Sequence, residues 1–242
     1  MKQISQSVAQ TINLIYKKPA RLCLGFLSLE LISRLLMYQF FISILILLIP
    51  LVAKAQTWDF AVSMNGKPIG THQFILTDTE NNQKILKSEA KFNIKILSIN
   101  FFQYHHQANE LWENNCLQKL EADTQENGKT TIVKGAQEKN SFKVSAPKPL
   151  DINAECVMTF AYWNPRILQQ KQLLNPQTGD YLASNISSLG QETILAKGQN
   201  IKAEHYKINT SKFKIDIWYG QNDEWLALQS LTEDGRIDYV LK

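Results

Sequence analysis

The sequence has few of the residues and none of the motifs on which common enzyme sites depend. Its 242 residues include 3 cysteines, 4 histidines and 10 glycines. No GxSxG, HExxH, P-loop or GxGxxG pattern occurs. The acidic residues are scattered, so no pair has the spacing of a glycosidase dyad. We therefore expect a protein that is on balance not an enzyme, and we assign it no catalytic residue, no metal site and no cofactor.

An excess of basic charge is also missing from most of the chain. The formal net charge is +4, but residues 1–55 hold six basic side chains and one acidic side chain. That leaves 20 basic and 21 acidic residues in the segment 56–242, a formal charge of −1. A balanced segment of this kind has no electrostatic attraction for phosphate backbones, so nucleic acid is not an expected partner.

The basic N-terminal segment has the features of an export signal. Residues 40–52 form an apolar run interrupted only by Ser43 and Pro50, and Ala53-Lys54-Ala55 follows as a small-x-small cleavage pattern. The run is shorter than the roughly 20 residues of a spanning helix. We expect cleavage between Ala55 and Gln56 by the secretion machinery, and a periplasmic protein.

Two alternatives to this N-terminal prediction stay open. The leader is long for a signal peptide, which suggests that translation could start at Met37 instead of Met1. Residues 35–53, read generously, could also remain as an inner-membrane anchor with the rest facing the periplasm. In either case residues 1–55 are the signal or anchor and residues 56–242 are one exported domain, with oligomeric state undetermined.

Alternation of apolar and polar residues dominates the exported segment and predicts an all-β fold. Residues 58–64 alternate with period two, and Asn65-Gly66, Asn127-Gly128 and Asp234-Gly235 are hairpin signals. The pattern predicts about a dozen strands, mostly antiparallel because hairpins connect them. So many strands rarely form a flat sheet. We predict a strongly curved antiparallel sheet, as a half-barrel, a barrel or a sandwich.

The alternation stops around residues 157–174, where we predict one short helical insert. Asn164-Pro165 is a favourable helix start, since Asn caps and Pro fits the first helical position. Phe160, Tyr162 and Trp163 make this insert rich in aromatic rings. The insert is either a lid whose rings fill the open side of the sheet or a gate to an apolar pocket, with Tyr162 and Asn164 offering hydrogen bonds.

One predicted strand carries polar groups on an aromatic face. His105 and His106 must point to opposite faces of a strand. The residues that share the face of His106 are Phe102, Tyr104, Ala108, Glu110 and Trp112. They are either a satisfied polar network in the core or the lining of a cavity that orients a ligand head group.

Glu110 on such a face would need a partner, because an unpaired buried carboxylate is costly. Lys91, Lys95 and Arg166 are the candidate partners. The other two histidines, His72 and His205, are expected to be structural.

The exported segment contains two cysteines, Cys116 and Cys156. An even pair in an oxidising compartment predicts a disulfide. Its loop of about 40 residues would stabilise the fold by roughly 4 kcal/mol in the chain-entropy model. Two buried free thiols are the alternative.

Nearly all of residues 57–242 resembles an exported bacterial family known as domain of unknown function 6134. The segments that carry the resemblance are 58–60, 65–70, 106–112, 116–117, 156–165, 173–179, 217–219 and 225–228. The resemblance implies export and supplies no activity, substrate or catalytic residue. The C-terminal hairpins also resemble envelope β-folds that wrap lipids, a likeness of fold that proves no function.

Three functions fit these observations. The favoured one is a non-catalytic envelope protein that binds an apolar or lipid-like ligand within the curved sheet, with Tyr104, His106, Glu110, Trp112, Tyr162, Trp163 and Asn164 as ligand-binding residues. The alternative is a structural or protein-interaction module without a ligand cavity. The least favoured is an envelope enzyme that uses His106 or Glu110 as acid or base.

Overall fold

A computed structural model describes residues 34, 37–39, 55–79, 82–96, 99–232 and 235–242. Most of the predicted signal or anchor lies outside these residues, while Ala55 and Gln56 open the first strand. Among the described residues, no helix combines the length and the apolar character that a membrane span requires.

The predicted all-β fold is confirmed, as one large antiparallel sheet of thirteen strands. Its first half contains β1 (Ala55–Met64), β2 (Lys67–Asp78), β3 (Gln83–Ile96), β4 (Ile99–Glu113), β5 (Cys116–Glu126), β6 (Lys129–Glu138), β7 (Ser141–Ser145) and β8 (Leu150–Ile152). Its second half contains β11 (Asn185–Ala196), β12 (Gln199–Asn209), β13 (Lys214–Tyr219), β14 (Trp225–Thr232) and β15 (Gly235–Leu241). Hairpins connect the strands within each half.

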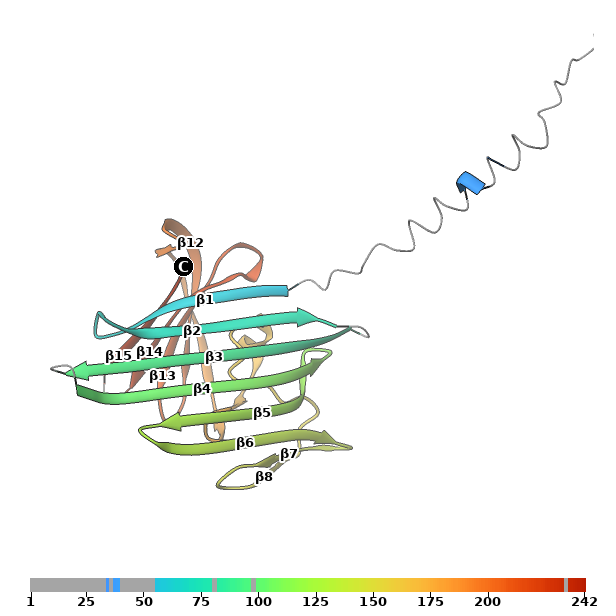
Figure 1. Cartoon of the computed structure of the whole chain (residues 1–242), viewed down its shortest axis with the longest axis horizontal. Helices are drawn as coiled ribbons and strands as arrows, with labels where there is room; N and C mark the ends of the chain where they lie inside the picture. The colour runs from blue at the N-terminus through green and yellow to red at the C-terminus, as the bar shows by residue number, and fades with distance from the viewer. Residues whose placement is uncertain (1–33, 35–36, 40–54, 80–81, 97–98, 233–234) are drawn as a thin grey trace, which may run out of the picture. The chain divides into compact units, whose positions relative to one another are not determined.

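The two halves join through the first and the last strand of the sheet. β15 hydrogen bonds to β1, with Phe60 opposite Leu241, so both lie in the middle of the strand order. β8 and β11 are the edge strands. The sheet is therefore open and strongly curved: in Figure 1, β2–β7 run across the view and β13–β15 pass behind them at a steep angle.

The asparagine-glycine hairpins form as the sequence predicts. Asn65 and Gly66 have φ angles of 49° and 78°. Asn127 and Gly128 have φ angles of 48° and 82°. Two positive φ angles in succession are the mark of the type I′ turn, whose twist matches that of the flanking strands. At the third predicted hairpin, Asp234 lies outside the described residues.

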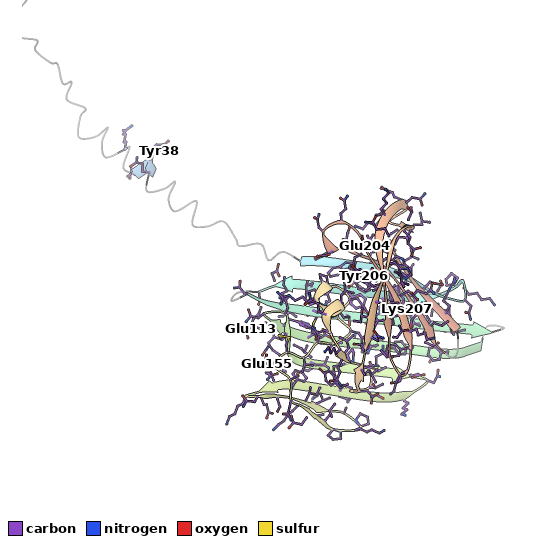
Figure 2. The ribbon with its side chains drawn as sticks, turned by 180° about the vertical axis from the view of Figure 1, so that it is seen from behind. Tyr38, Glu113, Glu155, Glu204, Tyr206 and Lys207 are labelled. Atoms are coloured by element: carbon purple, nitrogen blue, oxygen red, sulfur yellow. A yellow bond between two sulfur atoms is a disulfide. The ribbon has the colours of Figure 1, made fainter. Side chains whose placement is uncertain are left out.

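The main core lies on the concave face of the sheet, because every second side chain points there. On β1 the side chains of Trp58, Phe60 and Val62 are buried, and those between them are exposed or half-buried. On β12, Tyr206 packs against the core, while the next residue, Lys207, forms an ion pair with Asp216 at 3.4 Å. Tyr206 and Lys207 are labelled in Figure 2.

The segment between β8 and β11 is the predicted insert, and its helical part is confined to the 3₁₀ helix η2 (Pro165–Gln169). Asn164 caps this helix, since its side chain accepts a hydrogen bond from the backbone of Arg166. The rest of the insert is extended, with the short strands β9 (Gln172–Leu174) and β10 (Tyr181–Ala183). After η2 the backbone is extended at Gln170, and β9 pairs with β10 from Gln172 onward.

The insert is fastened to both halves of the sheet. A disulfide joins Cys116 of β5 to Cys156, so the bonded alternative for these cysteines is the one in the structure. Glu113 and Glu155, labelled in Figure 2, stand close to this bond. On the other side, the hydroxyl of Tyr219 donates to the carbonyl of Tyr162 at 2.7 Å. These attachments hold the aromatic rings of the insert against the concave face.

Candidate functional site: a cavity on the concave face

A cavity of about 740 Å³ lies on the concave face of the sheet. Its walls come from β1–β5, from the insert and from β13–β15, and most lining side chains are aliphatic or aromatic. The apolar and aromatic lining residues are Met64, Ile69, Phe74, Leu86, Ala90, Phe92, Ile94, Phe102, Tyr104, Phe160, Tyr162, Trp163, Pro176, Phe213, Ile215, Trp225, Leu228, Ile237 and Tyr239. The polar ones are His72, Ser88, His106, Glu110, Glu126, Asn127, Asn175, Gln177, Ser230 and Thr232.

Strand register places two histidines in one row of this wall. His72 of β2 lies opposite Ala90 of β3, and Ala90 lies opposite His106 of β4. Residues directly opposite on adjacent strands point to the same face. The small side chain of Ala90, which is 1% exposed, therefore leaves space between the two imidazole rings.

His106 is buried in the wall as a neutral ring. Its Nδ1 lies 2.8 Å from the hydroxyl of Thr124 on β5. Burial lowers the pKa of His106 to about 4, because desolvation disfavours the imidazolium. His105 points to the convex face, where its Nε2 lies 2.9 Å from Glu89, as the alternation predicts.

Glu110 is buried in the cavity wall, and no described lysine or arginine forms an ion pair with it. Its Oε2 accepts hydrogen bonds from Trp112 Nε1 at 2.9 Å and from the Thr159 hydroxyl at 3.3 Å. Burial raises the pKa of Glu110 to about 7, and these two hydrogen bonds offset part of that rise. Near neutral pH this group is therefore poised between its acid and its carboxylate.

Two of the three cationic partners expected for Glu110 are wrong. Lys91 lies on the convex face and pairs with Glu89 at 2.8 Å. Arg166 is exposed on the surface of the insert. The side chain of Lys95 lies outside the description. The indole of Trp112, two positions along β4, and the hydroxyl of Thr159 in the insert donate to Glu110 instead.

His72 also belongs to the site, although the sequence analysis expected a structural role for it. Its ring stacks on Phe74, with centroids 4.0 Å apart, and both its nitrogens are buried without a hydrogen-bond partner. Burial, assisted by the nearby His106, lowers the pKa of His72 to about 3. The available signal was its shared parity with Phe74 and Leu76 beyond the Asn65-Gly66 turn, which places all three on the concave face.

The insert supplies aromatic rings and one more unpaired donor. Trp163 packs edge-on against Trp112 with centroids 5.5 Å apart, and its Nε1 is buried without a partner. Tyr162 packs on Trp225 of β14 at 5.4 Å. The three unpaired buried atoms found among the described residues thus belong to His72 and Trp163, and both residues line the cavity.

The structure brings together five of the seven predicted ligand-binding residues. Those that line the cavity are Tyr104, His106, Glu110, Tyr162 and Trp163. Trp112 and Asn164 do not belong to the lining. Trp112 donates to Glu110, and Asn164 caps η2 while its Nδ2 donates to Asn115 at 3.3 Å.

The far wall of the cavity was missed from the sequence. Trp225, Phe213 and Tyr239 come from β13–β15 and from the loop before β13. Tyr239 packs edge-on against Phe92 of β3, with ring centroids 6.4 Å apart. Their approach depends on the pairing of β15 with β1, for which no local pattern exists.

One end of the cavity reaches the surface. Glu126 and Asn127, at the end of β5, and Gln177 of the insert are exposed and belong to the lining. Glu110, Trp225 and Trp163 at other parts of the lining are buried. The cavity thus has a polar mouth and a largely apolar interior. Among the described residues, no group of three histidine, cysteine or acidic side chains has the arrangement of a metal site.

Comparison with known proteins agrees with the fold. A family model described as domain of unknown function (DUF6134) matches residues 60–242. No curated protein matches the chain. A solved structure from Brucella abortus, a beta-barrel-like protein of domain of unknown function DUF1849, superposes with a TM-score of 0.58 at 10% identity. The match covers 79% of this chain and 96% of that chain, and at this identity it shows a shared fold.

Proposed function

This chain belongs to the DUF6134 family, and from that premise we propose that it is an exported cell-envelope protein that binds an apolar or lipid-like ligand in its concave cavity. The proposal makes binding, and not catalysis, the task of the site. It also assigns residues 1–55 to export, with the β-sheet acting in the periplasm.

The cavity is the observation that supports this proposal. Its volume of about 740 Å³ falls within the range of about 300–1,000 Å³ that is typical of small-molecule sites. Its lining is mainly aliphatic and aromatic, with a few buried polar groups. A water-filled space of this composition would be unfavourable, and an apolar ligand would remove that surface from water at about 25 cal/mol per Å².

A protein-interaction module is the second candidate, and the edge strand β11 is its support. This strand is exposed along most of its length, with Leu189 52% and Leu195 63% exposed. An open edge can accept a strand from a partner. An enzyme has less support, because His106 and Glu110 do not form a hydrogen bond with each other. His106 is hydrogen bonded to Thr124, and Glu110 to Trp112.

The test is to fill part of the cavity with a larger side chain from its wall. Ala90→Phe places a ring between His72 and His106, whereas Thr71→Phe adds the same ring to the exposed convex face of the adjacent strand. Protein purified from the periplasm, with Gln56 as its first residue, should carry co-purified lipid in native mass spectrometry. Ala90→Phe should lower the affinity for the apolar dye N-phenylnaphthylamine by at least ~10-fold, which corresponds to about 1.4 kcal/mol of binding free energy.

The control variant Thr71→Phe should take up the dye like the unmodified protein. A clean apo mass together with no dye uptake by the unmodified protein would rule out the ligand-binding function. Equal uptake by all three proteins would place the dye outside the cavity.

A further inference from the structure

Among the described residues, the charged side chains that line the cavity are of one sign. They are two carboxyl groups, Glu110 in the buried part and Glu126 at the exposed mouth, and this described lining has no lysine or arginine. An anionic group that entered the cavity would lose its hydration without meeting a cation. Burying such an unpaired charge is strongly unfavourable.

Glu110 has free capacity to accept hydrogen bonds. An ionised carboxylate offers about four lone-pair sites on two oxygens. Both donors to Glu110, Trp112 and Thr159, bond to its Oε2. No cation among the described residues forms an ion pair with it, so a donor from a ligand would meet an unneutralised acceptor.

The position of Glu110 sets the shape of such a ligand. The mouth lies where the backbone N–H of Asn127 donates to the carbonyl of Gln103, near the start of the lining part of β4. Tyr104, His106 and Glu110 then follow on the same face of that strand. The six-residue step from Tyr104 to Glu110 spans roughly 20 Å in an extended strand. A molecule that reaches Glu110 from the mouth must be long and mostly apolar.

Trp163 adds a second polar group near this inner end. Its ring packs on Trp112, which itself donates to Glu110, and its own N–H has no acceptor. A buried donor without a partner costs about 1–3 kcal/mol. A ligand hydroxyl could satisfy both groups, by donating to Glu110 and accepting from Trp163.

We infer that the cavity takes an elongated amphiphile whose buried end is a hydrogen-bond donor without negative charge, an amine or a hydroxyl group, received by Glu110. This inference rests on the proposed ligand-binding function. It names the chemical class of the ligand and excludes fatty acids and other molecules with an anionic inner end.

Three probes with the same twelve-carbon chain test the inference: dodecylamine, dodecanol and dodecanoate, below their micellar concentrations and at about pH 8. Their affinities follow from displacement of N-phenylnaphthylamine. In the unmodified protein, dodecanoate should bind at least ~10-fold more weakly than dodecylamine and dodecanol, a difference of about 1.4 kcal/mol.

Glu110→Gln separates ligand recognition from a structural role. Glutamine can still accept from Trp112 and Thr159, so a purely structural role would be rescued. It carries no charge and adds N–H donors, so dodecanoate should gain affinity until its disadvantage disappears. Glu89→Gln, which removes one negative charge from the convex face, should leave the order of the three probes as it is.

The outcomes separate the two proposals. If none of the probes binds, the ligand-binding function itself is overturned. If all three bind equally well to the unmodified protein, the cavity binds apolar chains and the inference about the buried end is wrong. The comparison in the unmodified protein stands even if a variant fails to fold.

Discussion

The histidines of the two faces of the sheet have opposite surroundings. On the convex face, His105 lies 2.9 Å from Glu89, and His205 lies 2.8 Å from Asp216 and 2.9 Å from Glu192. On the concave face, His106 meets the hydroxyl of Thr124 and the backbone of Asp123. His72 stacks on Phe74, and neither of its ring nitrogens has a hydrogen-bond partner among the described residues. The convex pair thus has carboxylate partners, and the concave pair is held neutral by burial.

The carboxylates show the same contrast. Glu89 on the convex face accepts from Lys91, His105 and Gln107, which lowers its pKa to about 2. Glu110 on the concave face has two uncharged donors, and burial raises its pKa to about 7. Buried polar groups are normally paired, so unpaired ones in a native fold need an explanation. The concave face keeps costly groups beside a cavity, which fits a site more closely than a core.

Loss of the disulfide that holds the insert on the concave face should give the largest change in stability. Replacing both cysteines, Cys116→Ser with Cys156→Ser, frees the insert from β5 and should lower the free energy of unfolding by about 2–4 kcal/mol. Urea unfolding of the double variant measures the change. An unchanged unfolding midpoint would mean that the remaining contacts of the insert suffice to hold it.

Neutralising a carboxylate should have opposite effects on the two faces. The pKa of Glu110 is about 7 in the fold against 4.5 as a reference, so the fold bears a penalty that is absent below pH 4.5 and complete above pH 7. Glu110→Gln should therefore stabilise the protein by up to about 3 kcal/mol at pH 8 and by almost nothing at pH 4.5.

The convex counterpart is Glu89→Gln. Because the pKa of Glu89 lies below its reference value, its contribution is present above pH 4.5 and is lost as pH falls toward 2. The side chain is 39% exposed, so at pH 8 the variant should lose less than about 1 kcal/mol. Urea unfolding at pH 8 and pH 4.5 measures the free energy of unfolding of the two variants. A change of the same sign at pH 8 for Glu110→Gln and Glu89→Gln would contradict the comparison.

The histidines of the two faces should also respond in opposite directions. His72→Phe keeps the stacking on Phe74 and removes two unpaired nitrogens, so it should stabilise the protein by about 1 to 2 kcal/mol at pH 8. The gain should grow below pH 6.5, where the unfolded chain protonates this histidine while the fold, with a pKa of about 3, keeps it neutral.

His205→Phe is the matched change on the convex face. It leaves Asp216, which is 9% exposed, without its histidine partner and should destabilise by about 1 kcal/mol. Thermal and urea unfolding of the two variants measure the contrast. A loss of stability in His72→Phe would show that its nitrogens are satisfied in solution.

Much of the local structure could be predicted from the chain. The period-two segments, the turns at Asn65-Gly66 and Asn127-Gly128, and the cap at Asn164 depend on neighbouring residues alone. Parity along a strand also placed His105 and His106 on opposite faces. Of the two donors to Glu110, Trp112 lies two residues along the same strand. Thr159 could not be predicted, because it reaches Glu110 from a segment 49 residues away.

By itself, the sequence determined which side chains share a face, where the strands turn and which family the chain belongs to, because alternation and turn conformation are properties of a few consecutive residues. Only the tertiary structure decided that β15 pairs with β1, that the sheet stays open, and that His72 and Trp163 keep unpaired nitrogens beside a cavity. Those features arise from contacts between distant segments, and the free energy of such contacts depends on how the whole sheet curves.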